Sequence, residues 1–409
     1  MTTDRGTGRA PAPAPARAPT PTPGPTSAHA PAAHAPAAAD RAARRRDRRV
    51  YLRSHPVLFA LLCLTRRRPV VRLGRTVLVH GTEAYREALT RVPLDRTAAG
   101  TTGGAAARLS GGGLLFDQEG ARHRAARRAV AADLGTGALD RIRPHWQAVL
   151  AERVPELATG SLELVTLAEE LAGVTAAALT GSGADPRTLA QACAAAAAAT
   201  ARDHLPGPRL PGHRRAGATA AARAADLTAL LPDPLDAMLT VAAVTTTVAA
   251  LPRAAAWCAD AGLWTGVDAG TAPGLAAELL RLTAPSPLLP RVTAADATLA
   301  GCPLRAGDRL VLVARHAAGA HRTGPAPGPA ATQAVFGAGP HACPGAGLAR
   351  ALLTDVLLAL APHRPVVVRA RVDRRSALPG YAELTVRRAP EPGAARPTTP
   401  ERPEESRCG

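Results

Sequence analysis

The chain has 409 residues, enough for one large domain or two ordinary ones whose core could enclose a cofactor. Its formal charge is +18, and all of its 50 basic residues are arginine. Because these arginines are scattered and only three Phe, three Tyr and three Trp could stack on bases, the composition argues against a nucleic-acid partner and favours an acidic protein instead.

The cysteines and the apolar runs indicate the cellular compartment of the protein. No two of the six cysteines form a Cys-x-x-Cys pair or a tight framework, which argues against a zinc site or a secreted disulfide scaffold. The longest apolar run near the N-terminus, residues 56–64, is far shorter than the roughly 20 residues that span a bilayer. We therefore expect a cytoplasmic protein that makes no contact with a membrane.

Composition separates a central domain from two tails. Residues 1–48 are dominated by Pro, Ala and Arg, which bury little apolar surface, and we expect a disordered leader there. Within it, the arginine run 41–50 favours a solvated helical lead-in over an anion-binding surface. Residues 391–409 have a similar disordered composition. Residues 49–390, which contain no internal repeat, are expected to form a single domain.

Taken in chain order, the central domain predicts helices with short strands between them. After an apolar helix, two β-branched runs, 69–73 and 76–80, flank Gly74 and Arg75 and predict a β-hairpin, which another helix follows. Residues 95–113 are rich in Gly, Thr and Ala and predict a flexible loop. The remaining segments complete a mainly α fold with minor β: alanine-rich helices over 120–200 and 213–230 with a Pro/Gly break over 205–215, helices over 236–262 and up to 282, short strands within 304–314, and a helix over 348–361.

The ten-residue stretch FGAGPHACPG, residues 336–345, contains the strongest candidate for a metal ligand, Cys343. Its glycines remove Cβ atoms where the backbone turns sharply or lies against a flat ligand. Pro344 and Gly345 lead into an apolar helix, whose positive end is expected to lower the pKa of the cysteine thiol and favour the metal-binding thiolate. The alternative, a buried structural cysteine, receives less weight because of three further stretches.

These three stretches each place polar side chains together on a helix. Glu278 and Arg281 in ELLR stand three residues apart and share a helix face, as His123 and Arg127 do at a spacing of four. The run AAVTTT, residues 242–247, puts threonines in mid-helix, where their hydroxyls can bond back to the preceding turn and bend the helix. Alone, each stretch has an ordinary explanation: a surface ion pair, a solvated cation pair or a β-branched core patch.

Together and in this order, the four stretches resemble those of a bacterial, actinomycete-like cytochrome P450. FGAGPHACPG matches the family's cysteine-loop signature at every fixed position, ELLR supplies its Glu-x-x-Arg pair, and AAVTTT stands where the family has its threonine motif. The resemblance extends over about residues 50–390. It implies the cytochrome P450 fold, a helix-rich prism with small β-sheets that holds haem b between the threonine helix and the cysteine-loop helix.

The resemblance also implies roles for residues around the haem. Cys343 would be the proximal thiolate ligand of the iron, with Phe336 packed beside it and Gly345 clearing space for the porphyrin. Glu278 and Arg281 would form a buried ion pair that fixes the coil carrying the cysteine, so removing either partner should strand a buried charge. The two propionates would be held by His123, Arg127, Arg291 and His341.

On the opposite, distal side of the haem, Thr246 matches the threonine that hydrogen-bonds dioxygen or its water and helps to deliver protons. Ala243 takes the place of the usual glycine in the oxygen-binding groove. Thr245 stands where the family has an acid, and neither threonine titrates near neutral pH, so protons would arrive through water, a substrate group or another hydroxyl. A second departure is the short Gly/Pro-rich coil 323–331, where the family has a longer meander.

The function implied by the resemblance is that of a monomeric haem-thiolate monooxygenase in natural-product metabolism. It would hydroxylate a small organic substrate, free or bound to a carrier protein, using dioxygen and electrons from a ferredoxin and its reductase. The missing acid leaves open a peroxygenase, a desaturating enzyme or an oxidative coupling enzyme. Outside catalysis, the alternative is a silent family member that assists another biosynthetic enzyme. An acidic ferredoxin would dock on Arg122, Arg124, Arg128, Arg322 and Arg350.

Overall fold

The computed structural model describes residues 37–204, 213–322 and 329–389, most of which lie in helices. The α-helices are α1 (Ala37–Ser54), α2 (Pro56–Thr65), α3 (Thr82–Thr90), α4 (Thr102–Ser110), α5 (Gly120–Asp133), α6 (Thr136–Arg153), α7 (Leu164–Thr180), α8 (Pro186–His204), α9 (His213–Leu230), α10 (Pro234–Ala261), α11 (Ala272–Thr283), α12 (Ala314–Ala317), α13 (Pro329–Gln333) and α14 (Ala346–Leu360). Short 3-10 turns are η1 (Val154–Ala158), η2 (Leu263–Gly266), η3 (Ala334–Phe336), η4 (Gly339–His341) and η5 (Ala361–His363).

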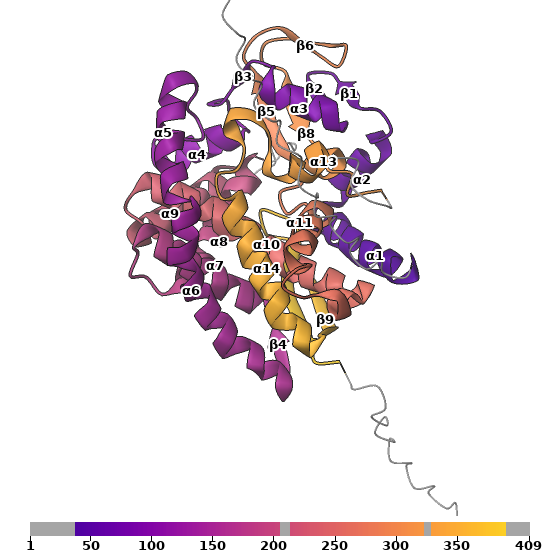
Figure 1. Cartoon of the computed structure of the whole chain (residues 1–409). Coiled ribbons are helices and arrows are strands. Elements are labelled where there is room, and N and C mark those ends of the chain that lie inside the picture. Colours follow the sequence, from indigo (N-terminus) through magenta and orange to yellow (C-terminus); the bar gives the residue numbers. More distant parts are fainter. Residues whose placement is uncertain (1–36, 205–212, 323–328, 390–409) are drawn as a thin grey trace, which may run out of the picture.

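The strands form three small sheets. The first has the order β1-β2-β8-β5-β3 and is antiparallel except for the parallel pair β2 and β8. The second has the order β4-β10-β9, and the third is the hairpin β6-β7. In Figure 1 the first sheet lies at the top of the molecule and β4 and β9 at the bottom. The strands are β1 (Val70–Leu73), β2 (Thr76–Val79), β3 (Leu94–Asp95), β4 (Ser161–Glu163), β5 (Leu289–Thr293), β6 (Ala297–Leu299), β7 (Cys302–Leu304), β8 (Arg309–Leu312), β9 (Val366–Asp373) and β10 (Gly380–Arg387).

Helix α10 is the central element on which the other layers are built. Asp233 caps its start by accepting from the amides of Leu235 and Asp236 at 2.8 and 3.0 Å, and Gly262, at a φ of 65°, ends it. It packs against α1, α7, α8, α11 and α14, and Figure 1 shows α10 and α14 crossing the middle of the molecule. Both α10 and the segment Ala346–His363 are long and apolar enough to cross a membrane, but this rests on length and composition only.

The main core fixes α14, the helix that follows the cysteine loop. Apolar side chains from α6, α7, α10, α11 and α14 form one buried cluster. At its edge the buried Asp355 of α14 accepts from Arg143 at 2.7 and 2.8 Å and from the Trp146 indole at 2.8 Å, both on α6. Because a buried carboxylate with three donors is well satisfied, this clamp holds α14 at one position against α6.

The predicted hairpin and the mainly α architecture are confirmed, but the loop predicted over 95–113 contains a helix. β1 and β2 pair as expected, with Val70 opposite Val79. The glycines of the expected loop serve close packing: a Cβ on Gly103 would lie 2.1 Å from the Arg96 carbonyl oxygen, and one on Gly104 a similar 2.2 Å from another carbonyl. Glycine therefore lets α4 lie directly on the chain that enters it.

The leader boundary at residue 48 is wrong. Residues 37–48 belong to α1, and this helix is not a solvated lead-in, because Ala43, Asp47 and Val50 are buried at 1%, 4% and 0% exposure. The apolar side chains pack in the main core, and Asp47 forms ion pairs inside the protein. The arginine-rich composition hid a helix with one buried face. The rest of the expected leader and the expected tail lie outside the described residues.

Candidate functional site

The cysteine loop is a tight turn that leads from η3 into α14. The amide of Cys343 donates to the carbonyl of Phe336 at 2.7 Å, which closes the loop on itself. Gly337 and Gly339 have φ values of 76° and 69°, a region that only glycine enters without strain. A Cβ on Gly339 would also lie 3.0 Å from the Thr90 methyl group, so the loop packs closely on α3. These two glycines are required by the fold of the loop itself.

Gly345 differs from the other two glycines of the loop. Its φ is −87°, which any residue adopts, and among the described residues a Cβ built on it meets no atom within 4 Å beyond its neighbours in the chain. The fold of this chain therefore gives no steric reason for glycine at the last position of the loop. A flat group lying against the backbone here would supply that reason.

The Cys343 thiol is accessible to solvent, yet burial raises its pKa above the ordinary value. The Gly345 amide and the arginines Arg127 and Arg350 act in the opposite direction but do not outweigh desolvation. The helix end does act in the predicted direction, through the Gly345 amide, but the net pKa of the free thiol is raised because desolvation is the larger effect. A coordinated metal ion would deprotonate the thiol regardless.

Arginine and histidine side chains gather beside the cysteine loop, and we call them the cationic group because the arginines carry its charge; they are His123, Arg127, Arg291 and His341. His123, on α5, is only 2% exposed, and its ring stacks on that of His341 with 3.8 Å between the centroids. Burial, and then the charges of Arg96, His123, Arg291 and Arg127, lower the pKa of His341 to about 3. The four predicted propionate ligands are therefore brought together, although they come from three elements of the fold, α5, β5 and η4.

The cationic group lacks an anionic partner for Arg291 among the described residues. Among the residues that the structure describes, Nε of Arg291 is buried without a hydrogen-bond partner, and the guanidinium donates to Thr102 Oγ1 at 3.2 Å and to the neighbouring Pro290 carbonyl. Burial, and then the charge of Arg96, lower the pKa of Arg291 to about 10. A partly buried cation whose Nε is buried without a partner is costly unless an anion pairs with it. Two carboxylates, such as haem propionates, fit this group.

Arg96 belongs to the same group and was missed in the sequence. It follows β3, is 9% exposed, and reaches Glu119 at 3.3 Å. Burial lowers the pKa of Arg96 by more than Glu119 raises it. A further anion would therefore stabilise the charge of Arg96 as well. Its only sequence signal is an arginine directly after a short strand, and one of 50 arginines does not stand out on that ground.

On α10 the predicted back-bonding of the threonines is confirmed. The hydroxyl of Thr245 donates to the Val241 carbonyl at 2.7 Å, and that of Thr246 to the Ala242 carbonyl at 2.8 Å. Ala243, one turn before Thr246, is exposed although it lies in the middle of the central helix. Both hydroxyl protons are therefore committed to the backbone, which leaves the hydroxyl oxygens to act as acceptors.

The ion pair of Glu278 and Arg281 is present, but it is buried on one side only. Arg281 is fully buried, whereas the Glu278 side chain is 38% exposed. The guanidinium donates to the carboxylate at 2.7 Å through Nε and also to the Ala318 carbonyl at 2.7 Å. It thus ties α11 to the end of α12, and α11 itself packs against η3, the turn of Phe336. Its support of the cysteine loop is indirect.

Four of the five expected docking arginines, Arg122, Arg124, Arg128 and Arg322, are exposed. Arg350, the fifth, is only partly exposed, because its guanidinium lies 4.8 Å above the Phe336 ring. Of the coil expected over 323–331, residues 323–328 lie outside the described part, and the next residues begin α13.

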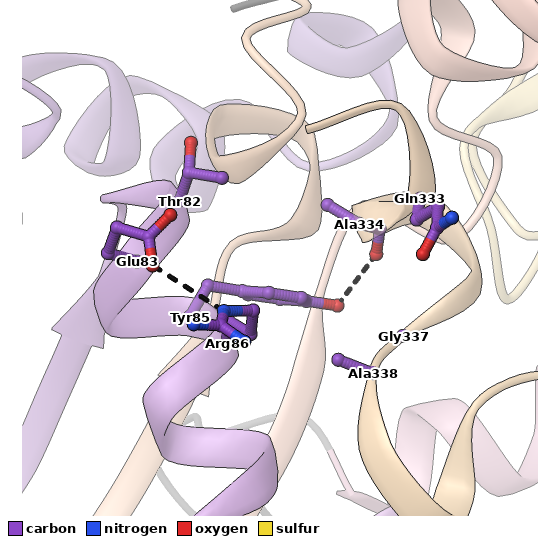
Figure 2. Close-up of a pocket in the computed structure, with 8 residues that line it drawn as sticks. All are labelled: Thr82, Glu83, Tyr85, Arg86, Gln333, Ala334, Gly337 and Ala338. Atoms are coloured by element: carbon purple, nitrogen blue, oxygen red, sulfur yellow. Dashed lines mark hydrogen bonds and ion pairs between the residues drawn. The ribbon is translucent and has the colours of Figure 1, made fainter. Parts of the chain in front are cut away.

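A hollow of about 450 Å³ lies behind the cysteine loop, between α3 and η3. Figure 2 shows the Tyr85 ring crossing it, with its hydroxyl on the Ala334 carbonyl at 2.9 Å and the ion pair of Glu83 and Arg86 at its rim. Gly337 lines the hollow, but neither the cysteine nor the cationic group does. Within the described residues, no three His, Cys, Asp or Glu side chains are arranged to hold a metal ion.

Comparison with known proteins identifies the fold. CYP109E1 from Bacillus megaterium, solved with testosterone, has a TM-score of 0.63, is 18% identical, and is matched over 83% of this chain and 99% of that one. P450BioI, in complex with an acyl carrier protein ligated to hexadec-9Z-enoic acid, has a TM-score of 0.62 and is 16% identical, with 83% and 99% covered. StaH, from glycopeptide antibiotic A47934 biosynthesis, has a TM-score of 0.56 and is 20% identical, with 78% and 93% covered.

No family model and no curated protein matches the sequence. The likeness to solved structures nevertheless covers most of the described chain, and the structures are those of bacterial cytochromes P450. The chain therefore has the cytochrome P450 fold.

Proposed function

Given the cytochrome P450 fold, we propose that this chain is a haem-thiolate monooxygenase that oxidises a small organic substrate. The observation that carries the proposal is the juxtaposition of Cys343 with a cationic group that contains the orphaned Nε of Arg291. The thiol would bind the iron of haem b, and the cationic group would pair with its propionates.

In this proposal each end of the haem has its own holders. Cys343 would be the residue that binds the iron, and Gly345 would let the ring lie against the backbone. When bound, the haem supplies the redox chemistry of iron with dioxygen. Around it, Nε of Arg291 would gain the anionic partner that it lacks among the described residues. The residues that would hold the propionates are His123, Arg127, Arg291, His341 and Arg96.

On the distal side, the chain's own contribution is to place water without supplying an acid. The Thr246 hydroxyl keeps its proton on the Ala242 carbonyl, so its oxygen is free to accept from a water molecule. The Thr245 hydroxyl likewise donates its proton to a backbone carbonyl, that of Val241. A threonine neither takes up nor releases a proton near neutral pH, so it does not replace the acid that the family has at this position. The closest acid on α10, Asp236, stands nine residues before Thr245, about 14 Å along the helix. Protons would therefore reach the site through water or the substrate.

A spectrum tests the proposal. The purified protein, reduced and exposed to carbon monoxide, should show the red-shifted Soret band of a thiolate-ligated haem, and Cys343→Ser should lose that band because a hydroxyl is a poor replacement for the thiolate. Haem content and folding are measured alongside, by pyridine haemochrome and circular dichroism. A well-folded chain that binds no haem would point instead to a silent family member that assists another enzyme.

Thr245 favours a second candidate, a peroxygenase or a coupling enzyme. An enzyme that starts from dioxygen needs protons delivered to the distal side, whereas hydrogen peroxide brings its own. Turnover with a ferredoxin system should be compared with turnover on hydrogen peroxide alone, in the native chain and in Thr245→Asp. If Thr245→Asp raises only the ferredoxin-driven rate, the native enzyme is limited by proton delivery. A native rate that is higher with peroxide supports the second candidate.

The partners proposed are a ferredoxin with its reductase and a small-molecule substrate. The exposed arginines of α5 support an acidic electron donor. The carrier-protein complex of P450BioI and the antibiotic pathway of StaH support a natural-product substrate, free or attached to a carrier protein. We propose that the enzyme acts as a monomer in the cytoplasm.

A further inference from the structure

Helix α2 is apolar on every side, yet one side of it faces solvent. None of its ten residues, PVLFALLCLT, is charged. Phe59 and Leu62 face inwards and pack in a buried cluster beneath β2. The other side exposes Val57 at 84%, Leu61 at 39% and Leu64 at 80%. A helix that is apolar all round is typical of a protein core or a membrane rather than of a surface half in water.

The exposed side chains of α2 form one stripe rather than scattered points. Val57, Leu61 and Leu64 are spaced by four and three residues, which places them on a single helix face. They are three of the five large apolar side chains that the described part of the chain exposes. The other two, Leu73 on β1 at 45% and Val368 on β9 at 48%, lie on strands of different sheets. Single exposed apolar residues are ordinary, but a stripe indicates a contact surface.

Arginines lie at both ends of this stripe. Four exposed arginines flank α2. One is Arg53 at the end of α1, one turn before α2, and the other three follow α2 directly. Between residues 37 and 75 there are twelve arginines and only two aspartates, each of which is ion-paired to an arginine. This segment therefore carries a strong excess of positive charge. The arginines directly after α2 are Arg66, Arg67 and Arg68, and α1 exposes Arg41, Arg45, Arg48 and Arg49.

We propose that α2 docks on the surface of a membrane that contains anionic phospholipid. The apolar stripe would enter the boundary between headgroups and acyl chains, and the flanking arginines would contact lipid phosphates. At ten residues α2 is half the length needed to span a bilayer, so it would lie in the surface. Charge alone would suit an acidic protein equally, but the uncharged stripe between the arginines favours lipid. This replaces our expectation of no membrane contact.

A flotation experiment with the haem-loaded full chain tests the proposal. We expect binding to vesicles of phosphatidylcholine mixed with phosphatidylglycerol, little binding to phosphatidylcholine alone, and weaker binding at high salt. The double variant Val57→Asn/Leu64→Asn should lower the partition coefficient by at least ~tenfold. The matched control Leu73→Asn/Val368→Asn removes two exposed apolar side chains elsewhere and should bind like the native chain.

A charge comparison separates the proposed surface from the general basicity of the chain. Replacing Arg66, Arg67 and Arg68 by glutamine should weaken vesicle binding more than replacing Arg122, Arg124 and Arg128 on α5, although each triple variant removes three charges. An equal loss in both would overturn the proposal, because the net charge of +18 would then explain binding. So would a native chain that ignores anionic vesicles, or one that forms dimers which Leu64→Asn dissociates, since the stripe would then face a second copy.

Discussion

Replacing Asp47 by alanine is expected to lower the free energy of unfolding by about 3–5 kcal/mol. Asp47 Oδ1 accepts from Arg253 at 2.6 and 3.0 Å, and Oδ2 lies 2.9 Å from Arg315. Burial alone would lower the pKa of Arg253, but Asp47 and Tyr51 hold that pKa above its ordinary value, so the guanidinium stays charged. In the variant, two cations would lose the carboxylate that they share inside the protein.

The effect should be large because Asp47 sits at a junction of several elements. Arg253 on α10 also donates to the Pro379 carbonyl, just before β10, and the Tyr51 hydroxyl donates to the Thr283 carbonyl at the end of α11. The Tyr51 ring lies 4.5 Å from the Arg253 guanidinium and 3.9 Å from that of Arg315. The network therefore joins α1 to α10, α11, α12 and the start of β10.

Urea unfolding followed by circular dichroism measures this effect. The control is Asp40→Ala on the same helix, which removes a partly exposed partner of Arg44 and should change the free energy of unfolding by at most about 1 kcal/mol. A chain that begins at residue 49 lacks Asp47 and should fail to fold stably. If Asp47→Ala proves no more destabilising than Asp40→Ala, then water hydrates Arg253 and Arg315 in the folded variant, and the junction does not hold the fold together.

The parts of the site that the sequence predicted are those encoded in contiguous residues. The turn around Cys343 follows from its glycines and the helix after it, and the threonine back-bonding follows from a helical run that contains Thr245 and Thr246. In both cases neighbours in the chain are neighbours in space, so local rules suffice. The hairpin of β1 and β2 was predictable for the same reason.

The features that the sequence did not reveal depend on contacts between distant segments. The role of Asp47 rests on Arg253, 206 residues away, and nothing near it in the chain indicates a buried face. Arg96 joins the cationic group only because β3 pairs with β5 and brings it close to Arg291. Glu278 was expected to be buried because the resemblance implies a buried ion pair, but burial of each member of a pair is set by separate neighbours.

A buried pair of histidines is expected to make the protein lose stability as the pH falls below about 6.5. Nδ1 of His80 and Nδ1 of His316 lie 2.9 Å apart, and the two residues are 4% and 6% exposed. Because two nitrogens at this distance can share only one proton, charging both rings would set two donors against each other. The Thr65 hydroxyl, 3.1 Å from Nε2 of His80, fixes the other side of that ring.

The charges that face the pair all act in the same direction. Burial lowers the pKa of His80 to about 4, and burial followed by the charge of His80 lowers that of His316 to about 2. His321, whose ring is 5.0 Å from that of His316, has its pKa lowered to about 4, mainly by burial. The arginines that face these rings add positive charge and lower the pKa values further; they are Arg66, Arg315 and Arg322.

The sign of the effect follows from these shifts. Each histidine has a lower pKa in the folded chain than its ordinary value of about 6.5, so the unfolded chain binds more protons below that pH. The stability is therefore complete above about pH 7 and declines as the pH falls, by about 2 kcal/mol at pH 5 for each of His80 and His316.

Urea unfolding of the haem-loaded chain at pH 7 and pH 5 measures the decline. In His316→Gln it should shrink by about 2 kcal/mol, because the contribution of one titrating ring is gone. His145→Gln, on the exposed side of α6, should leave it unchanged. A decline of equal size in His316→Gln and the native chain would place the acid sensitivity elsewhere, among groups other than this pair.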